Sequence, residues 1–284
     1  MTSGVALVVK PPGCSSHDVV RAIGRRTGAP CGHLGTLDPL AAGLLVVAVG
    51  GATRLIRYAE GQDKEYLAEF WFGLGTASQD LGGPVADLAD ASGLGEAQVL
   101  EALAWAGRQT LQRPPDYSAV QVAGQRAYRA ARAGRPLELA ERPAALREAG
   151  PLEFRPGARA VLRARLWVSP GYYVRALARD LGAYLGLPCV LGFLLRLRSG
   201  PFRLEQARTL EEEPELAPKE LLVQHLPSVE VSPAEAERLG HGQRLPGAGD
   251  RAGLHRLGSG GRLVAVAEAR AGVWHPETVC AMED

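Results

Sequence analysis

Asp38 is the acidic side chain best placed for chemistry in this sequence. It lies in residues 32–43, GHLGTLDPLAAG, between glycines and directly before a proline. Glycine allows backbone angles that other residues cannot hold, and proline restricts the residue before it to an extended conformation. The valine-rich apolar run 44–49 that follows predicts a buried strand. We therefore expect a stiff loop that holds one carboxylate beside a sheet, where it can act as a nucleophile or proton carrier.

Other interpretations of this segment are possible. An aspartate before a proline often does no more than start a turn. A phosphate-binding loop is excluded because no Gly-Lys-Ser or Gly-Lys-Thr sequence ends the glycine-bounded segment. A zinc site built from Cys14, His17, Cys31 and His33 is disfavoured, because their spacings match none of the standard ligand pairs. We therefore expect no metal at this site.

Short motifs surround Asp38 and continue far along the chain. Before residue 70 they are KPPG at 10–13, SS at 15–16, GHLGTLDPLA at 32–41, GGATR at 50–54 and DKEY at 63–66. After it they are SAV at 118–120, GQRAY at 124–128, ARAG at 131–134, GYYVR at 171–175 and DLG at 180–182. Over roughly residues 5–205 these motifs resemble, in the expected order, the TruB-type bacterial tRNA pseudouridine synthases. The resemblance implies an enzyme that isomerises uridine 55 in the T loop of tRNA to pseudouridine.

The resemblance implies three catalytic residues, Asp38, Tyr66 and Arg175. The reaction breaks the bond from C1′ to N1, rotates the base and joins C1′ to C5, so it needs no redox or group-carrying cofactor. Asp38 would either attack the pyrimidine ring or assist departure of the base and move a proton, and the sequence leaves both routes open. Arg175 is expected beside Asp38, because a guanidinium keeps a carboxylate ionised and oriented. Tyr66 would stack on the base with its hydroxyl near the carbon that loses a proton, although a strand tyrosine can also simply pack in the core.

A uridine inside a structured loop must be extruded before it can react, and extrusion costs stacking energy. The resemblance implies that His33 takes the vacated place in the T loop; the alternative is a structural histidine bonded to the glycine turn. Lys10 and Lys64 are expected to organise the active-site loops or to contact phosphate. Leu197 is expected in the apolar wall beside the base.

Positive charge is concentrated in one part of the chain. The formal net charge is only +1, but residues 121–210 hold 16 arginines against six acidic residues. Arg126, Arg129 and Arg132 recur every three residues around Tyr128 and continue to Arg135. At helical spacing such a series makes a broad basic stripe, and arginine suits phosphate through its two-pronged geometry. We expect it to contact RNA, where the family inserts a loop against the T arm, rather than to be only a solvated helix face.

Hydrophobic patterns predict a mixed α/β or α+β fold. Strands are expected at 5–9, 44–49, 66–72 and 160–168, and helices at 17–27, 95–106 and 175–185. Residues 1–222 would form the catalytic domain, with an RNA-binding insertion at about 121–150. An acidic stretch at 211–220 would separate it from a small β-rich domain at 223–284, which resembles the PUA kind.

Composition agrees with a cytoplasmic enzyme. No apolar run approaches the length of a signal or membrane segment, and four cysteines without a dense pattern predict reduced thiols. We expect a monomer that binds the T-arm stem-loop of tRNA, uses no cofactor and contacts no membrane. Two alternatives are an idle tRNA-binding or tRNA-folding module of the same fold and a glycoside-type hydrolase. The hydrolase would need a second carboxylate, and the sequence around Asp38 supplies none.

Overall fold

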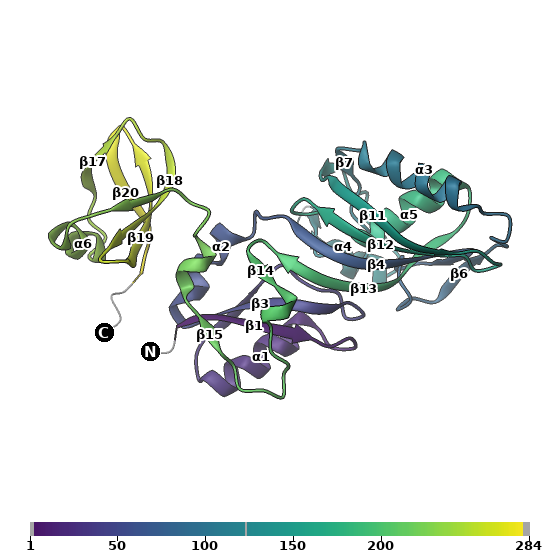
Figure 1. The fold of residues 1–284 in the computed structure, drawn as a ribbon, viewed down its shortest axis with the longest axis horizontal. Helices are drawn as coiled ribbons and strands as arrows, with labels where there is room; N and C mark the ends of the chain where they lie inside the picture. The colour runs from purple at the N-terminus through teal and green to yellow at the C-terminus, as the bar shows by residue number, and fades with distance from the viewer. Residues whose placement is uncertain (1–2, 123, 281–284) are drawn as a thin grey trace.

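A nine-stranded mixed sheet organises most of the chain (Figure 1). The computed structural model describes residues 3–122 and 124–280. The main path of the sheet runs in the order β11-β12-β4-β13-β3-β1-β15, while β2 pairs with β3 and β14 with β13. All neighbouring strands are antiparallel except β13 and β3. The strands are β1 (Gly4–Lys10), β2 (Cys31–Leu34), β3 (Ala42–Val49), β4 (Lys64–Phe72), β11 (Leu146–Arg155), β12 (Val161–Val168), β13 (Cys189–Ser199), β14 (Phe202–Arg203) and β15 (Leu216–Ala217).

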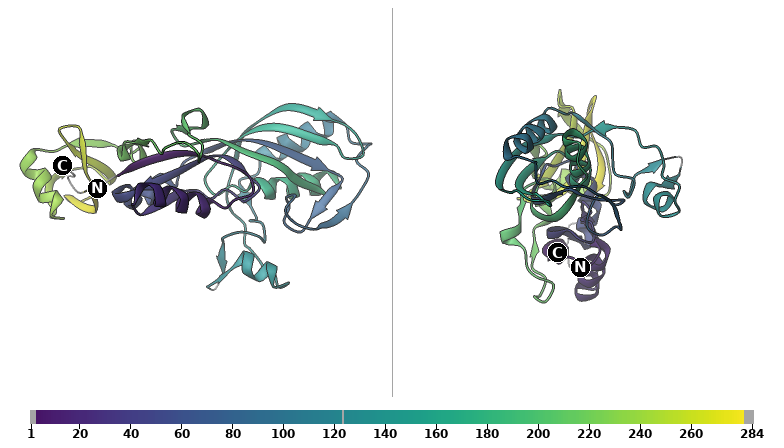
Figure 2. Two further views of the ribbon diagram at one scale, coloured as in Figure 1. Left: turned by 90° about the horizontal axis from the view of Figure 1, so that it is seen from below. Right: turned by 90° about the vertical axis from the view of Figure 1, so that its right-hand side faces the viewer.

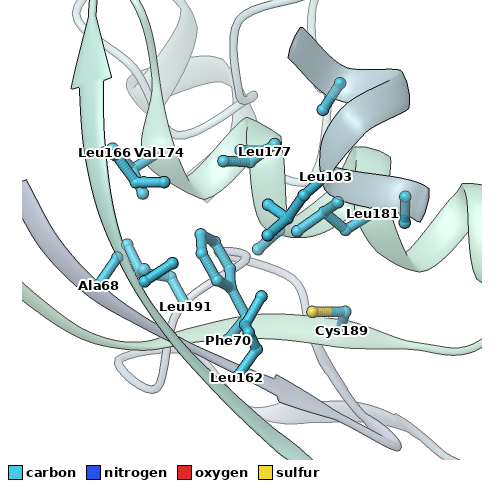
Figure 3. Close-up of a cluster of buried hydrophobic side chains, with 14 of the residues drawn as sticks. Ala68, Phe70, Leu103, Leu162, Leu166, Val174, Leu177, Leu181, Cys189 and Leu191 are labelled. Carbon is cyan, nitrogen blue, oxygen red and sulfur yellow. The ribbon is translucent and has the colours of Figure 1, made fainter. Parts of the chain in front are cut away.

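Two helices, α3 (Glu96–Gly107) and α5 (Val174–Leu185), cover one face of the sheet where it is formed by β4, β12 and β13. Successive strand residues point to opposite faces, so alternate residues of β4 enter this core. Figure 3 shows Phe70 of β4 among Leu162 of β12 and leucines from both helices. This core anchors the start of α5, from which Arg175 projects.

The other end of the sheet carries the loop with Asp38. Strand β3 is almost entirely buried, which agrees with its run of valine and leucine. Helix α1 (Ser16–Thr27) packs against β2 and β3, beginning at a capping box formed by Ser15 and Asp18. It ends at Gly28, whose φ of 64° is a left-handed conformation that favours glycine. After β3 the chain turns through a 3-10 segment (Gly50–Leu55) and α2 (Ile56–Ala59) into β4.

Part of the chain projects from the sheet (Figure 2). It contains the small hairpin of β8 (Gln121–Val122) and β9 (Gln125–Arg126) and the short helix α4 (Ala127–Arg132). The expected helical stripe of arginines is therefore only partly correct, because Arg126 lies in the hairpin and Arg135 lies beyond the helix. Two further small sheets join β5 (Leu74–Thr76) to β6 (Val85–Leu88) and β7 (Leu111–Gln112) to β10 (Arg142–Pro143).

The C-terminal part forms a five-stranded sheet, in the order β16-β18-β19-β20-β17, with helix α6 (Pro233–Gly240) packed against it. Its strands are β16 (Ser228–Glu230), β17 (Leu245–Gly249), β18 (Gly253–Ser259), β19 (Arg262–Arg270) and β20 (Gly272–Val279). Leu263 and Val266 of β19 belong to the same buried cluster as Leu44 and Val46 of β3. The two sheets therefore share an apolar contact.

The four strands and three helices predicted from the sequence are all present, with shifts of at most two residues at their ends. The acidic stretch 211–220 is more than a separator, because β15 lies within it and pairs with β1 in the main sheet. Cys14, Cys31 and Cys189 carry free thiols. Among residues 3–122 and 124–280, no helix has the length and apolar character needed to span a membrane.

Candidate active site

A cavity of about 440 Å³ opens beside the loop that carries Asp38, a size typical of small-ligand sites. The wall is formed by the loop after β2, the end of α2, strand β4, the base and helix of the projecting segment, the start of α5, and strand β13. The residues that line it are Gly35, Thr36, Leu37, Asp38, Glu60, Lys64, Tyr66, Tyr117, Ser118, Ala119, Tyr128, Gly171, Tyr172, Tyr173, Val174, Arg175, Leu194 and Arg196.

Asp38 and Arg175, 137 positions apart, form a two-pronged ion pair. Arg175 donates from Nε to Oδ2 of Asp38 at 2.8 Å and from Nη2 to Oδ1 at 3.1 Å. The guanidinium is nearly buried, while 38% of the Asp38 side chain remains exposed toward the cavity. Arg175 is itself fixed by the carbonyl groups of Ser78 at 3.2 Å and Tyr117 at 3.0 Å. The arrangement holds the Asp38 carboxylate in a set orientation beside the guanidinium that the sequence placed there.

Asp80 is a second carboxylate near the pair, and the sequence-based reasoning did not identify it. Its Oδ2 lies 3.7 Å from Nε of Arg175, and its side chain is 14% exposed. Its Oδ1 accepts hydrogen bonds from the Ser78 hydroxyl at 2.6 Å and from the Gly82 backbone at 2.9 Å. Asp80 therefore fixes the turn whose Ser78 carbonyl accepts from Arg175. The Ser-x-Asp-x-Gly pattern of residues 78–82 is a turn signal that points to this geometry.

Lys10 holds the loop that carries Asp38 (the Asp38 loop, residues 35–41) in place. Its ammonium donates to the carbonyl groups of Pro11 at 2.9 Å, Pro39 at 3.2 Å and Ala41 at 2.7 Å. The side chain is fully buried, and burial lowers the pKa of Lys10. All three ammonium hydrogens have acceptors, so the structure places Lys10 in loop organisation, one of the two roles expected for it.

The Ser16 hydroxyl also holds this loop. It accepts from the Leu37 backbone amide at 2.9 Å and lies 3.0 Å from the Leu37 carbonyl, to which it donates. Ser16 begins α1, so these hydrogen bonds connect the helix to the loop that carries Asp38.

Tyr66 and a leucine of β13 contribute to the wall of the cavity that Asp38 also lines. Tyr66 is 7% exposed, belongs to the core cluster and also lines the cavity, so packing in the core leaves part of this ring facing the cavity. The leucine on the wall is Leu194, whereas Leu197 lies at a β-bulge between Arg196 and Arg198 and does not line the cavity. Leu194 and Leu197 are three positions apart, and the alternation of side chains along a strand places such positions on opposite faces.

His33 lies in strand β2 opposite Val47, before the loop rather than on it. It does not line the cavity, and its Nδ1 is buried without a hydrogen-bond partner among the described residues. Burial, with the charge of Arg196, lowers the pKa of His33 and favours the neutral ring. Lys64, by contrast, lines the cavity and donates from Nζ to the Gln62 carbonyl at 2.9 Å.

The projecting segment brings its arginines to the rim of the cavity. Tyr128 of α4 lines the cavity, and the guanidinium groups of Arg129 and Arg132 each lie 6.0 Å from the centre of its ring. Arg129 also donates from Nε to the Tyr128 hydroxyl at 3.2 Å. Arg126, Arg129 and Arg132 are all exposed. They present positive charge to solvent beside the entrance.

The two cysteines near the Asp38 loop make local contacts. The Cys14 thiol donates to the Pro11 carbonyl at 3.5 Å, and the Cys31 thiol donates to the Ala29 carbonyl at 3.4 Å. The part of the chain that the structure describes contains no group of three or more His, Cys, Asp or Glu side chains arranged to hold a metal ion.

The family model described as TruB family pseudouridylate synthase (N terminal domain) matches residues 26–174. A tRNA pseudouridine synthase B of Thermobifida fusca is 41% identical and aligns over 99% of both chains. One from Symbiobacterium thermophilum is 45% identical over 84% of this chain and 82% of its own.

Solved structures with a similar fold include chains of RNA–protein complexes. An H/ACA RNP chain bound to a substrate RNA containing 2′-deoxyuridine matches with a TM-score of 0.73 and 25% identity, covering 97% of this chain and 84% of that chain. A chain of a Cbf5-Nop10-Gar1 complex matches with a TM-score of 0.71 and 26% identity, covering 99% of this chain and 84% of that chain. These likenesses extend over the fold that builds the Asp38 cavity. The chain belongs to the TruB family of pseudouridylate synthases.

Proposed function

We propose that this protein converts uridine to pseudouridine in tRNA, at position 55 of the T loop. The observation that carries the proposal is the two-pronged Asp38–Arg175 pair, with Asp38 open to a cavity that Tyr66 also lines. Relatives of nearly full length named tRNA pseudouridine synthase B support tRNA as the substrate.

The site contains what an isomerisation of uridine needs. The bond from C1′ to N1 breaks, a bond from C1′ to C5 forms, a proton leaves C5 and N1 gains one, so no electrons enter or leave. Arg175 fixes the direction of the Asp38 carboxylate through two hydrogen bonds, and Asp38 acts on the pyrimidine ring or assists departure of the base from the sugar. The ring of Tyr66 supports the base, with its hydroxyl near C5.

Two other functions have less support. A non-catalytic RNA-binding module would not require a partly exposed carboxylate held by two hydrogen bonds from a buried arginine. For a glycoside-type hydrolase the second carboxylate is Asp80, but one of its oxygens is occupied by Ser78 and Gly82 and the other faces Arg175. The proposal includes a catalytic unit at 1–222, a PUA-like unit at 223–284, and a monomer that acts in the cytoplasm.

The direct test is incubation of the purified protein with unmodified tRNA, followed by a chemical that marks pseudouridine. We expect a single new mark at position 55 and none in a transcript with cytidine there. Marks elsewhere, or no mark with a folded transcript, would contradict the proposed function.

Replacing Arg126, Arg129 and Arg132 together by alanine should weaken tRNA binding and flatten its salt dependence. Each lost phosphate contact removes roughly 0.7–0.9 from the slope of log affinity against log salt. Turnover at saturating tRNA should change much less. The measurement is tRNA affinity as a function of salt concentration for the triple-alanine variant, with the triple-lysine variant and Arg108→Ala as controls. An unchanged salt slope for the triple-alanine variant would mean that the arginines form only a solvated face.

His33→Ala should mainly impair extrusion of the target uridine. A ring that fills the vacated place recovers stacking worth roughly 1–3 kcal/mol, so we expect turnover on tRNA to fall by about tenfold or more. The defect should shrink on a stem-loop whose target uridine is already unstacked. Equal defects on both substrates, measured by steady-state kinetics, would assign His33 a structural role instead.

A further inference from the structure

Gln112 is a buried polar side chain that lies outside the lining of the Asp38 cavity. It is 6% exposed and belongs to β7, where it pairs with Arg142 of β10. These two short strands form the neck of the projecting segment, residues 113–141. The part of the chain that carries the exposed arginines therefore leaves the main fold beside Gln112 and returns beside it.

The side-chain amide of Gln112 pairs with the backbone of Tyr173. Its Oε1 accepts from the Tyr173 amide at 2.9 Å, and its Nε2 donates to the Tyr173 carbonyl at 3.1 Å. A backbone amide can only donate and a carbonyl can only accept, so one orientation of the Gln112 side chain satisfies both. Two hydrogen bonds to a single residue fix both the position and the direction of its backbone.

Tyr173 is the N-cap residue of α5, so Gln112 acts on the start of this helix. The Tyr173 carbonyl also accepts from the Leu177 amide at 3.1 Å, as the first hydrogen bond of the helix. In a capping box the third helical residue accepts from the amide of the cap residue. That residue is Ala176, whose methyl side chain cannot accept, and Gln112 supplies the acceptor from another segment. Gln112 thereby fixes the first turn of α5, which contains Arg175.

The projecting segment touches α5 at further points. The Tyr117 carbonyl accepts from Nη2 of Arg175 at 3.0 Å. The Arg113 carbonyl accepts from Nη2 of Arg179 at 2.9 Å. The Tyr173 side chain packs against the buried cluster of the projecting segment, Val120, Ala127 and Leu139. The segment with the exposed arginines and the helix with Arg175 are therefore anchored to each other.

We propose that Gln112 is a positioning residue for the reaction, which holds Arg175 in register with Asp38 through the backbone of Tyr173. The inference rests on the proposed function, since it assumes that the Asp38–Arg175 pair acts on a uridine. A displacement of about 1 Å in a catalytic group can cost about 10²-fold in rate. A helix start that is free to shift would move the guanidinium by its own displacement, and the Asp38 carboxylate would lose its set direction.

The first test separates catalysis from binding. Gln112→Met keeps the length of the side chain and removes both hydrogen bonds. We expect kcat on tRNA to fall by about tenfold, while KM and the Kd from fluorescence anisotropy stay within a few fold of the parent. The matched control is Gln109→Met, because the Gln109 amide donates to the Trp105 carbonyl at 3.1 Å and does not contact Tyr173. It should retain the kcat of the parent.

The second test asks through which residue Gln112 acts. In an Arg175→Lys background Gln112→Met should cause little further loss of kcat, because the geometry that Gln112 maintains is already lost. In the variant with Arg126, Arg129 and Arg132 replaced by alanine, its tenfold effect on kcat should persist in full. Independent losses in the Arg175→Lys background would overturn the proposal. So would a defect in KM that disappears in the triple-alanine variant, because Gln112 would then only shape the RNA-binding segment.

The design distinguishes this inference from the proposed function. If the parent protein fails to form pseudouridine in tRNA, the proposed function is wrong. If the parent is active and Gln112→Met keeps its full kcat, only the positioning role is wrong. Should Gln112→Met fail to fold, as judged by its melting curve, Gln112→Glu replaces it. The ionised glutamate keeps the acceptor for the Tyr173 amide and lacks the donor for the carbonyl, so the same dependence on Arg175 is expected.

Discussion

Asp38→Asn is expected to abolish pseudouridine formation, with a loss of roughly 10³-fold or more, while tRNA affinity stays within a few fold. The amide keeps the shape of the side chain but cannot act as a nucleophile or carry the proton. Binding depends on the exposed arginines and on stacking, which the substitution leaves in place. The measurement is single-turnover pseudouridine formation beside a binding titration.

The matched control is Asp116→Asn, which removes a carboxylate paired with Arg113 at 3.2 Å outside the cavity lining. It should retain full turnover. Measurable turnover by Asp38→Asn protein prepared free of host enzyme would contradict the role assigned to Asp38. A similar melting temperature for both variants would show that loss of activity is not loss of the fold.

Arg175→Lys should reduce turnover by about 10²-fold, although the positive charge is kept. An ammonium cannot reproduce two parallel hydrogen bonds, and the shorter reach leaves the Ser78 and Tyr117 carbonyls without their donor. The Asp38 carboxylate would lose its fixed direction. We expect the defect in kcat rather than in KM, because Arg175 is buried and acts through Asp38.

Arg179→Lys is the control for this prediction. Arg179 lies one turn further along α5 and contacts Asp180 and the Arg113 carbonyl, away from Asp38. Its substitution should leave kcat within a few fold of the parent. Full turnover by Arg175→Lys would mean that charge alone is sufficient and that the two-pronged geometry is dispensable.

Asp38 stays partly exposed because different residues hold its loop and its carboxylate. Lys10 and Ser16 hold the loop through backbone groups, and Arg175 holds the carboxylate through its own fixed guanidinium. The carboxylate is therefore restrained by the protein and remains accessible from the cavity. Such preorganisation avoids reorienting the carboxylate during the reaction.

The sequence by itself determined the local structure and the principal candidates for the reactive groups. Helix α1, strands β1, β3, β4 and β12, and the stiff loop with Asp38 follow from hydrophobic periodicity, glycine and proline. These signals act over a few residues, so they survive folding unchanged. Asp38, Tyr66 and Arg175 were identified through motifs, and their placement in one cavity agrees with that expectation.

Only the tertiary structure decided which partner each polar group has. Asp80 reaches Arg175 across the fold, and the ammonium of Lys10 is used by three carbonyl groups, because chain segments remote in sequence pack together. Leu194 rather than Leu197 lies on the wall, because side chains alternate along a strand and the assembled sheet decides which face of β13 meets the cavity. Strand β15 joins the main sheet from an acidic stretch because β1 offers an unpaired edge, and edge pairing depends on the assembled sheet rather than on local composition.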